Sequence, residues 1–389
     1  MLTEIPENRY NIPLMHARIH FINFFRKLTV TSLLFLMPLH FLKIGLSGLQ
    51  IGAIISLWAL APLLISFPTG WINDRVSMAG VIRAGLLAES LLLLVMAYAD
   101  GFYLMGAAFL CLGMANNALD VSFNSLYYKD EKVMDQNRKY GIYVFWISLG
   151  PAVGVVGGGF LTRFADFRVL LLVFAAILLL VLLATRRFDH EKFHMVSLGD
   201  YRKNLFQTKT LLFILFVFIL ALHWSVEGTV YGPFLQKAFG LDNLQVSYYM
   251  SAGLFFLSFS AFLVGLLKFN LRANKRLLVL AMFLSGAGLV LMVNSNVYVS
   301  LAFRLVHEIG DGALGALLTL FTARLFEKRT IGGSAGLISA ISILGQMAGA
   351  LIFSPLGYRY GLQYPFLIAG GLLVLNAGFG AVLFRRIEY

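Results

Sequence analysis

The chain contains twelve long apolar segments, and each is long enough to cross a lipid bilayer as a helix. A membrane-spanning helix needs about 20 predominantly apolar residues. Runs of this kind occur at 19–42, 48–69, 79–98, 101–127, 139–162, 168–185, 210–236, 244–267, 276–294, 297–323, 332–356 and 363–384. Charged residues make up only 13% of the chain, whereas they are about a quarter of an ordinary soluble domain. The sequence therefore predicts an all-α integral membrane protein.

The lysine and arginine residues indicate which side of the membrane each loop faces. Short cytoplasmic loops carry an excess of both. With the N-terminus inside, 23 of the 31 cations fall in segments expected in the cytoplasm, five fall in external loops and three lie inside the membrane. We therefore expect an integral protein of the bacterial inner membrane, with both termini cytoplasmic. The net charge of +12 follows from this bias and favours membrane lipids, not nucleic acid, as a partner.

The second half of the chain repeats landmarks of the first half at an offset of 195 residues. The matching pairs include Pro38 and Pro233, Gly45 and Gly240, Gly70 and Gly265, Gly141 and Gly336, Gly150 and Gly345, and Gly154 and Gly349. A parallel repeat of six helices predicts two bundles related by a pseudo-two-fold axis along the membrane normal, with substrate bound between them. We expect one bundle at 1–185, a cytoplasmic linker at 186–209 and a second bundle at 210–389.

A short polar segment, 70–77, separates the second apolar run from the third. Two spans joined by so few residues form a tight hairpin, which places Asp74 and Arg75 at the membrane surface. A carboxylate there accepts hydrogen bonds from the exposed N–H groups at the start of the next helix. Gly70 allows helices to approach closely. We interpret this segment as a cytoplasmic gate.

The same segment resembles a loop motif of the major facilitator superfamily, Gly-x-x-x-Asp-Arg-x-Gly-Arg-Arg/Lys, and the resemblance extends over essentially the whole chain. The match is partial, because a glycine and two basic residues of the motif are replaced by Ser77, Met78 and Ala79. Arg83 is then the remaining nearby cation. The repeat-related copy has Phe269 in place of the acid, so the resemblance implies a latch on one side only.

The fifth apolar run contains a second motif, in which Gly150 and Pro151 are followed by Gly154. It is similar to the Gly-Pro-x-x-Gly-Gly motif that is frequent in proton-driven exporters of the same superfamily. Proline frees a backbone carbonyl and bends a helix, and glycines allow close packing. The motif therefore favours an exporter in which these residues take part in gating. Simple glycine-mediated packing is the alternative.

The resemblance implies that the first, fourth, seventh and tenth helices line a central cavity. An ionisable side chain at the midplane costs roughly 3 kcal/mol on insertion scales and usually faces a cavity or a partner. The tenth helix holds Arg304, His307, Glu308 and Asp311, and their spacing puts them on one helical face. We interpret this face as a proton relay with an arginine beside it. The alternative is a charge network within the helix that has no transport role.

The first and fourth helices carry a second group of polar residues. Arg26 and Lys27 are expected at the depth of Asp120, and Asn116 lies on the same stripe as Asp120. An unpaired buried charge is expensive, so we expect an Arg26–Asp120 pair. The pair is either a structural salt bridge or part of a cationic patch for a carboxylate or phosphate, which the arginine fork suits.

The seventh helix contributes His223, Glu227 and Tyr231 on one face, next to Trp224. Histidine titrates near neutral pH, so this face suits proton binding, with a hydrogen-bonded structural histidine as the alternative. Glu89 lies in the third helix, which the resemblance places at the periphery. We do not assign Glu89 to the site.

Enzyme chemistry finds no support in the sequence. The chain has no Gly-x-x-x-x-Gly-Lys-Ser/Thr loop, no metal-ligand spacing such as Cys-x-x-Cys or His-Glu-x-x-His, and no nucleophile motif. We therefore expect no enzymatic activity, no metal and no cofactor. The energy for any movement of a substrate has to come from a gradient or from the substrate itself.

These patterns together predict a secondary active transporter. We expect a monomer that exports a small amphipathic organic molecule in exchange for protons, by alternating access. The alternatives within transport are a proton symporter that imports an anionic or zwitterionic metabolite, and a flippase for lysolipids or other lipids. A sensor that kept the fold without transporting is a further alternative, because fold does not fix function.

Overall fold

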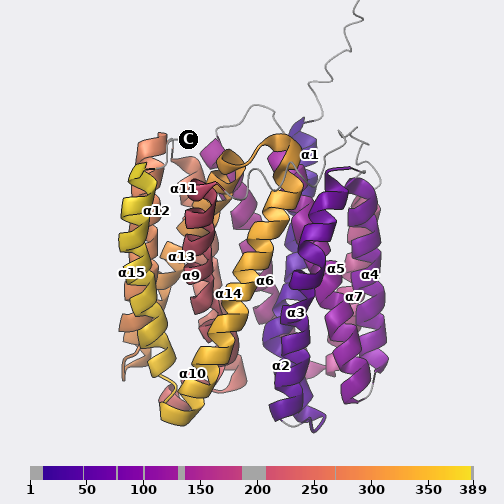
Figure 1. Cartoon of the computed structure of the whole chain (residues 1–389). Coiled ribbons are helices and arrows are strands. Elements are labelled where there is room, and N and C mark those ends of the chain that lie inside the picture. The colour runs from indigo at the N-terminus through magenta and orange to yellow at the C-terminus, as the bar shows by residue number, and fades with distance from the viewer. Residues whose placement is uncertain are drawn as a thin grey trace, which may run out of the picture.

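The computed structural model describes residues 12–46, 48–75, 78–99, 101–129, 136–185, 207–267 and 269–386. These residues form helices and short connections, and no strand occurs among them. Most of the expected linker, 186–206, lies outside the described residues. The helical elements (Figure 1) are α1 (Ile12–Arg26), η1 (Lys27–Thr31), α2 (Ser32–Lys43), α3 (Gly48–Asn73), α4 (Met78–Tyr98), α5 (Phe102–Lys129), α6 (Gln136–Phe164), α7 (Phe167–Ala184), α9 (Thr208–Thr229), α10 (Tyr231–Phe239), α11 (Asn243–Leu266), α12 (Leu271–Leu291), α13 (Val297–Leu325), η3 (Lys328–Thr330), α14 (Ile331–Tyr360) and α15 (Tyr364–Arg386).

The first predicted helix is interrupted at its centre. The sequence predicts one helix at 19–42, but η1 is a π-helical turn between α1 and α2. Two hydroxyls compete for backbone carbonyls in this region: Thr29 Oγ1 donates to the carbonyl oxygen of Arg26 at 2.9 Å, and Ser32 Oγ donates to that of Leu28 at 2.5 Å. Such bonds offer the backbone an alternative to the regular ladder. Single π-turns of this kind often occur at functional sites.

The seventh predicted helix, 210–236, is also divided. α9 ends at Thr229 and α10 begins at Tyr231. Pro233 has no N–H to donate to the carbonyl of Thr229, four residues earlier, and its ring clashes with that carbonyl. The helix therefore breaks at Val230, immediately beyond the polar residues of α9.

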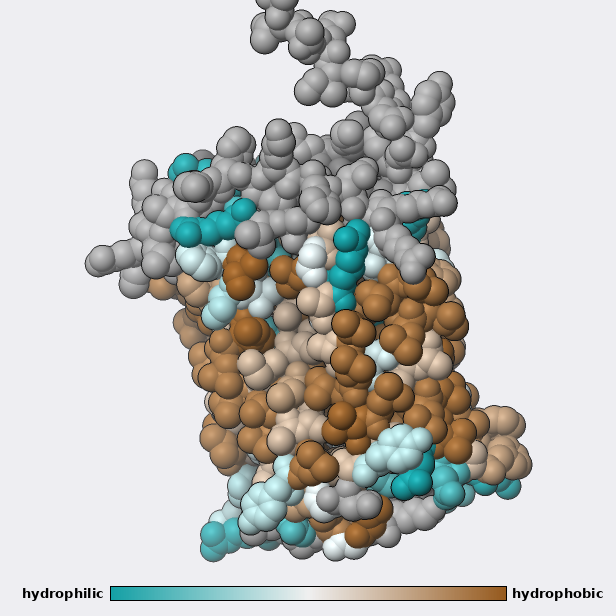
Figure 2. Space-filling model, turned by 90° about the vertical axis from the view of Figure 1, so that its right-hand side faces the viewer, coloured by the Kyte–Doolittle hydropathy of each residue, from teal (hydrophilic) through white to brown (hydrophobic). Residues whose placement is uncertain are grey.

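Eleven helices of the described chain are long and apolar enough to cross a membrane. The remaining predicted span, 297–323, is the tenth in the chain and is present as the 29-residue helix α13, whose apolar sequence contains several charged residues. Arg304, Glu308 and Asp311 of this helix are all buried, so these three charges point into the protein. The outer face seen in Figure 2 shows a broad hydrophobic band between more polar ends.

Repeat-related glycines adopt the same unusual backbone conformation. Gly45 has φ of 83° and Gly240 has φ of 66°, a left-handed region that glycine enters without strain. Each ends the first helical pair of its half, α1–α2 or α9–α10. The two glycines are separated by the 195-residue offset. The fold is therefore the predicted one, two six-helix bundles related by pseudo-two-fold symmetry.

The glycines of the second motif pack inside the first bundle. A Cβ at Gly150 or Gly154 would collide with backbone carbonyls of α1 and η1, and Gly345 and Gly349 of α14 meet carbonyls of α9 in the same way. Pro151 lies inside α6. Close packing of α6 on α1 explains these glycines structurally, and their role in gating remains a prediction.

The two bundles meet along two helix pairs, α6 with α11 and α3 with α14. Gly141 of α6 faces Gly265 of α11, and Gly70 of α3 faces Gly332 of α14, at distances that leave no room for a side chain. Figure 1 shows α14 leaning towards α3 near the top of the view and separating from it towards the bottom. The bundles are therefore held together at the end that carries the 70–77 segment.

Asp74 joins the bundles directly. Its carboxylate accepts hydrogen bonds from the backbone N–H groups of Gly332, at 3.2 Å, and Gly333, at 2.9 Å. These are among the first N–H groups of α14, which have no acceptor within the helix, and the positive end of the helix dipole favours an anion there. The sequence reasoning expected Asp74 to bond to the start of the next helix in the chain and did not foresee these bonds to α14. The helix start that Asp74 caps belongs to the other bundle.

The opposite edge of the same end is closed by amides. Asn137 at the start of α6 and Asn274 in α12 exchange two hydrogen bonds of 2.9 Å between their side chains, and both are buried. An acid is indeed missing on this side, as the sequence predicts. A neutral pair takes its place, so the two edges of the interface are both joined.

The remaining cations of the predicted gate make other contacts. The guanidinium of Arg75 stacks on Trp71, 3.9 Å from the ring centre. Arg83 in α4 donates from Nη2 to the carbonyl oxygen of Thr185 at 3.1 Å, just beyond the end of α7. Arg83 therefore ties α4 to α7 within the first bundle.

We expect Gly332→Ala to weaken the closed end. A Cβ there would lie 2.6 Å from Asp74 Oδ1 and 2.8 Å from the Gly70 carbonyl oxygen, so the bundles would have to separate or Asp74 to withdraw. The control is Gly378→Ala in α15, where a Cβ meets nothing within 4 Å and alanine is favoured by about 1 kcal/mol in a helix. Thermal unfolding in detergent should show a lower Tm for Gly332→Ala only. Equal Tm values for the two variants would contradict this account of the interface.

Candidate functional site

The described charges buried in the second bundle gather between α9, α12 and α13. We call this group the histidine–carboxylate cluster, and it consists of His223, Glu227, Ser285, Arg304, His307, Glu308 and Asp311. The four residues from α13 share one face because they are spaced by three or four positions. That face meets the polar face of α9, so the helical periodicity of two segments brings the cluster together.

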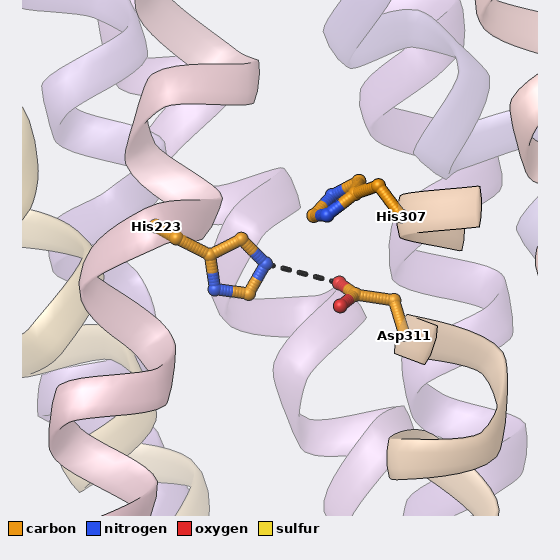
Figure 3. Close-up of side chains that lie close together, drawn as sticks. All are labelled: His223, His307 and Asp311. Atoms are coloured by element: carbon orange, nitrogen blue, oxygen red, sulfur yellow. Dashed lines mark hydrogen bonds and ion pairs between the residues drawn. The ribbon is translucent and has the colours of Figure 1, made fainter. Parts of the chain in front are cut away.

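Asp311 is the hydrogen-bond acceptor at the centre of the cluster. It accepts from His223 Nε2 at 3.0 Å, from Trp224 Nε1 at 3.1 Å and from Ser285 Oγ at 2.6 Å. Figure 3 shows His223 reaching across from α9 towards Asp311, with His307 beside them on α13. The Asp311 carboxylate therefore joins its own helix, α13, to both α9 and α12.

Glu227 and Arg304 form the second part of the cluster. Arg304 donates from Nη1 to Glu227 Oε1 at 2.5 Å and forms an ion pair with Glu308, one turn along α13. His307 Nε2 lies 2.9 Å from the same Glu227 oxygen. The Arg304 guanidinium also stacks on Tyr231, 4.6 Å from the ring centre. Arg304 is thus surrounded by two carboxylates and an aromatic face, which compensates for its complete burial.

Each imidazole of the cluster lies between two acceptors. His223 Nδ1 is 2.5 Å from the Leu220 carbonyl oxygen, while its Nε2 faces Asp311. A neutral imidazole has only one N–H, and an imidazolium has two. Both contacts are satisfied only when the His223–Asp311 pair holds one proton more than a neutral ring and a carboxylate, on either partner.

His307 repeats this arrangement. Its Nδ1 is 2.8 Å from the Ser285 carbonyl oxygen and 3.1 Å from the Ser285 hydroxyl, and its Nε2 faces Glu227. The contacts with the carbonyl and with Glu227 are both satisfied when the His307–Glu227 pair holds a second extra proton. With both protons bound, each histidine–carboxylate pair is neutral, and the charge of Arg304 balances that of Glu308. The loss of both would leave two uncompensated negative charges in a buried site, which is strongly unfavourable.

The cluster opens to its surroundings mainly through Glu227. The Glu227 side chain is 21% exposed, against 6% for Asp311 and at most 1% for Arg304, His307, Glu308 and His223. A proton or a ligand that enters from open space therefore meets Glu227 first.

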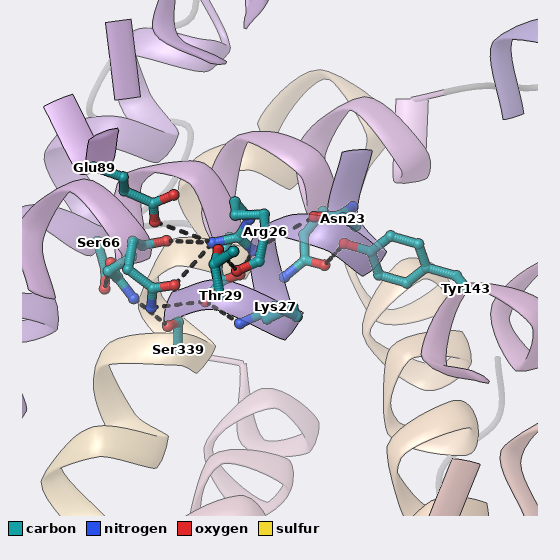
Figure 4. Close-up of polar contacts among 12 residues, drawn as sticks. Asn23, Arg26, Lys27, Thr29, Ser66, Glu89, Tyr143 and Ser339 are labelled. Atoms are coloured by element: carbon teal, nitrogen blue, oxygen red, sulfur yellow. Dashed lines mark hydrogen bonds and ion pairs between the residues drawn. The ribbon is translucent and has the colours of Figure 1, made fainter. Parts of the chain in front are cut away.

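The first bundle holds a smaller group, which we call the arginine cluster: Asn23, Arg26, Lys27, Glu89, Asn116 and Asp120. The expected pair of Arg26 and Asp120 is present. Lys27 Nζ donates to the second Asp120 oxygen at 2.9 Å, and Arg26 Nη1 donates to Asn116 Oδ1 at 2.8 Å. Figure 4 shows Arg26 at the centre of these contacts, with Lys27 beside it.

The arginine cluster reaches open space through Asp120 and Lys27. Their side chains are 28% and 15% exposed, while that of Arg26 is 1% exposed. Asn117, next to Asn116 on α5, accepts from Ser66 of α3 at 2.7 Å and donates to Ser339 of α14 at 3.3 Å. This polar chain connects the region of the cluster to the other bundle.

Glu89 is a member of the arginine cluster that the sequence reasoning set aside. Its side chain is fully buried, one of its oxygens lies 3.7 Å from Arg26 Nη1, and neither oxygen has a hydrogen-bond donor among the described residues. The position of α4 in the fold suggested a peripheral residue, but Glu89 points inwards from it. A carboxylate within an apolar membrane segment usually faces a partner, and this feature of the sequence could have identified Glu89. Ser285 also went unrecognised, because a single serine in a membrane helix carries no such signal.

Two overlapping triads of the histidine–carboxylate cluster have donor atoms close enough to hold a metal ion: His223, His307 and Asp311, and Glu227, His307 and Glu308. A metal binds imidazole through an unprotonated nitrogen. Here every ring nitrogen of the two histidines is occupied by a backbone carbonyl or a carboxylate. The arrangement therefore fits bound protons better than a metal.

The structure thus combines two repeat-related helical bundles that meet at glycines with a cluster of buried charges inside each bundle. Repeated bundles of this kind are typical of membrane transport proteins. Residues 19–268 and 213–388 match the profile of the Major Facilitator Superfamily. The chain belongs to the major facilitator superfamily, whose members are secondary active transporters and not enzymes.

A solved structure supports the same fold. The chain is similar to the human organic anion transporter MFSD10 (TETRAN), with a TM-score of 0.74 and 15% sequence identity, over 94% of this chain and 99% of that one. At this identity the likeness concerns the fold alone. A search of curated protein sequences gave no match.

We expect Asp311→Ala to destabilise the protein more than Asp311→Asn. Alanine leaves the three donors to Asp311 without an acceptor, which costs roughly 3–5 kcal/mol for a broken buried pair, whereas asparagine keeps one acceptor oxygen. The control is Asp166→Ala, since Asp166 makes no side-chain cap bond at α7. Thermal unfolding in detergent measures the order, and an alanine variant as stable as the asparagine variant would refute the role of Asp311 as central acceptor.

The two carboxylates beside Arg26 should respond in opposite ways. Glu89→Gln replaces a buried group that receives no hydrogen bond, so we expect an unchanged or higher Tm. Asp120→Asn removes the charge that balances both Arg26 and Lys27, so we expect a lower Tm. Unfolding curves recorded under identical conditions test this order, and the reverse order would show that Glu89 is the main counter-ion of Arg26.

Proposed function

We propose that this transporter is a proton-coupled antiporter that exports a small amphipathic organic molecule. The observation that carries the proposal is that two buried imidazoles each face a carboxylate and a backbone carbonyl. Two extra protons in the cluster satisfy all four contacts, and imidazole is the side chain that most readily exchanges protons in proteins. A buried site that is neutral only when protonated is suited to exchanging protons for another ligand.

Glu227 is the group at which cargo and proton compete. It is the most exposed carboxylate of the cluster, and it binds both Arg304 and His307. A cargo group that replaces His307 in the contact with Glu227 takes away the negative charge that stabilises a proton on His307. The proton then leaves, and the return of a proton from the other side displaces the cargo.

The cluster is connected to the closed end of the interface. α9, which carries His223 and Glu227, packs on α14, and α14 packs on α3. The first N–H groups of α14 are those capped by Asp74. A shift of α9 on loss of protons therefore acts on the helix that closes the two bundles. The proposal puts this end and both termini in the cytoplasm of a bacterium, because most lysines and arginines fall on that side, and treats the monomer as the working unit.

The proposal predicts ligand-induced proton release. Purified protein in weakly buffered detergent, with a pH-sensitive dye, is mixed with a library of amphipathic cations, zwitterions and organic anions. A true cargo should release protons from the wild type. The release should be lost in Glu227→Gln, Glu308→Gln and Asp311→Asn, because each removes a carboxylate of the cluster.

Glu327→Gln serves as the matched control. Glu327 is 58% exposed and pairs with Arg329 at the surface, so the release should be unchanged. If the three cluster variants all keep proton-driven transport at the wild-type rate, the proposal is wrong.

A second candidate function rests on the arginine cluster. Arg26 and Lys27 hold Asp120, a carboxylate that is partly exposed, and an anionic or zwitterionic metabolite offers the same group. In this reading the protein imports such a metabolite together with protons. Uptake into liposomes driven by an inward proton gradient should then fall several-fold in Lys27→Gln and stay unchanged in Lys237→Gln, a substitution in α10 far along the chain. Cargo movement that needs an outward-directed exchange would favour the antiporter instead.

A further inference from the structure

The outer face of the first bundle carries a groove that the transport site does not use. It lies where α4 and α7 pack together, at the end of the fold that carries Asp74, and its volume is about 460 Å³. It is lined by Arg83, Ala84, Leu87, Leu182, Leu183 and Thr185. Figure 1 shows α4 and α7 at the right-hand edge of the molecule, and the same side in Figure 2 is covered by the hydrophobic band.

Arg83 is the polar group of this groove. Its Nη2 bonds to the Thr185 carbonyl oxygen at 3.1 Å, and its Nε is buried without a hydrogen-bond partner among the described residues. A guanidinium has five N–H donors in a planar fork, which matches the oxygens of a phosphate. This one described bond uses a single N–H of Nη2, so the other N–H groups of the two terminal nitrogens remain for a ligand, while Nε is shielded.

The rest of the groove suits a hydrocarbon chain. Leu87 is 42% exposed and Leu183 is 50% exposed. Arg83 is five residues from the start of α4, about 7.5 Å along the helix axis at 1.5 Å per residue. A cation at that depth is near the headgroup level of a bilayer, with Leu87 about one turn further into the hydrocarbon region and Leu183 beside the end of α7.

We propose that this groove binds an anionic phospholipid from the leaflet at the Asp74 end. The phosphate contacts the Arg83 guanidinium, and one acyl chain lies along Leu87 and Leu183. The positive charge at the head of an otherwise apolar surface favours a lipid with net negative charge over a zwitterionic one. A water-soluble anion finds no second cation among the lining residues. The inference does not depend on the proposed direction or cargo of transport.

Arg168 provides a matched control on the same two helices. Its Nε donates to the carbonyl oxygen of Ala97 at 2.8 Å, so it joins the start of α7 to the end of α4. Arg83 joins the start of α4 to the end of α7 in the same way. Arg168→Gln therefore removes an equivalent charge and bond at the opposite end of the helix pair, away from the groove.

The test is native mass spectrometry of the purified full-length protein with added phosphatidylglycerol, phosphatidylcholine or inorganic phosphate, together with the Tm in each mixture. The wild type should retain phosphatidylglycerol and gain Tm from it. Retention should fall at least five-fold in Arg83→Gln and in Leu183→Trp, which fills the groove, and remain in Arg168→Gln. Arg83→Lys keeps the charge and should retain part of the binding, which separates lost binding from lost folding.

Three results would overturn the proposal. Retention of phosphatidylglycerol by both Arg83→Gln and Leu183→Trp would show that the lipid binds elsewhere. Equal retention of phosphatidylcholine would show that the lipid charge is not recognised. Displacement of the lipid by millimolar inorganic phosphate would identify a site for a free anion.

Discussion

The structure depends on the compensation of charge inside an apolar fold. A charged side chain in the membrane interior needs a partner, and most of the buried charges among the described helices belong to two groups. Three carboxylates face Arg304 and two histidines in the second bundle. In the first bundle Arg26 and Lys27 face Asp120 and Glu89. Each bundle is thus held by a local balance of charge that several helices share.

The two clusters differ in how their balance can change. Arginine and lysine hold their charge over the physiological range, so the arginine cluster is balanced by fixed cations. Histidine in general gains and loses a proton near neutral pH, so in the proposed function the balance of the histidine–carboxylate cluster changes with bound protons. The two bundles have the same helix arrangement and share the 195-residue sequence repeat. Their buried polar residues nevertheless suit different chemistry.

The sequence predicted what local periodicity determines, and it could not predict what depends on distant segments. The face of α13 that carries Arg304 and Asp311 follows from spacing alone, and so do the spans and the repeat. Asp74 is a different case, because its partners Gly332 and Gly333 lie more than 250 residues away and any exposed helix start fits a carboxylate equally well. The role of Glu89 was missed for a similar reason. Whether a residue of α4 points inwards depends on how that helix is rotated against α5 and α7. A helix with apolar residues on all sides does not reveal this rotation.

The π-helical turn η1 has a mechanical meaning. A π-turn holds one residue more than the α-helical turn it replaces, and each residue of an α-helix advances by about 100° around the axis. Relaxation of η1 to regular geometry would rotate α1 against α2 by about that angle and lengthen the segment by about 1.5 Å. Arg26 is the last residue of α1 before this turn, with Asp120 and Glu89 as its acidic neighbours. A change in η1 would therefore turn α1 about its own axis, and it would move the Arg26 guanidinium relative to Asp120 and Glu89.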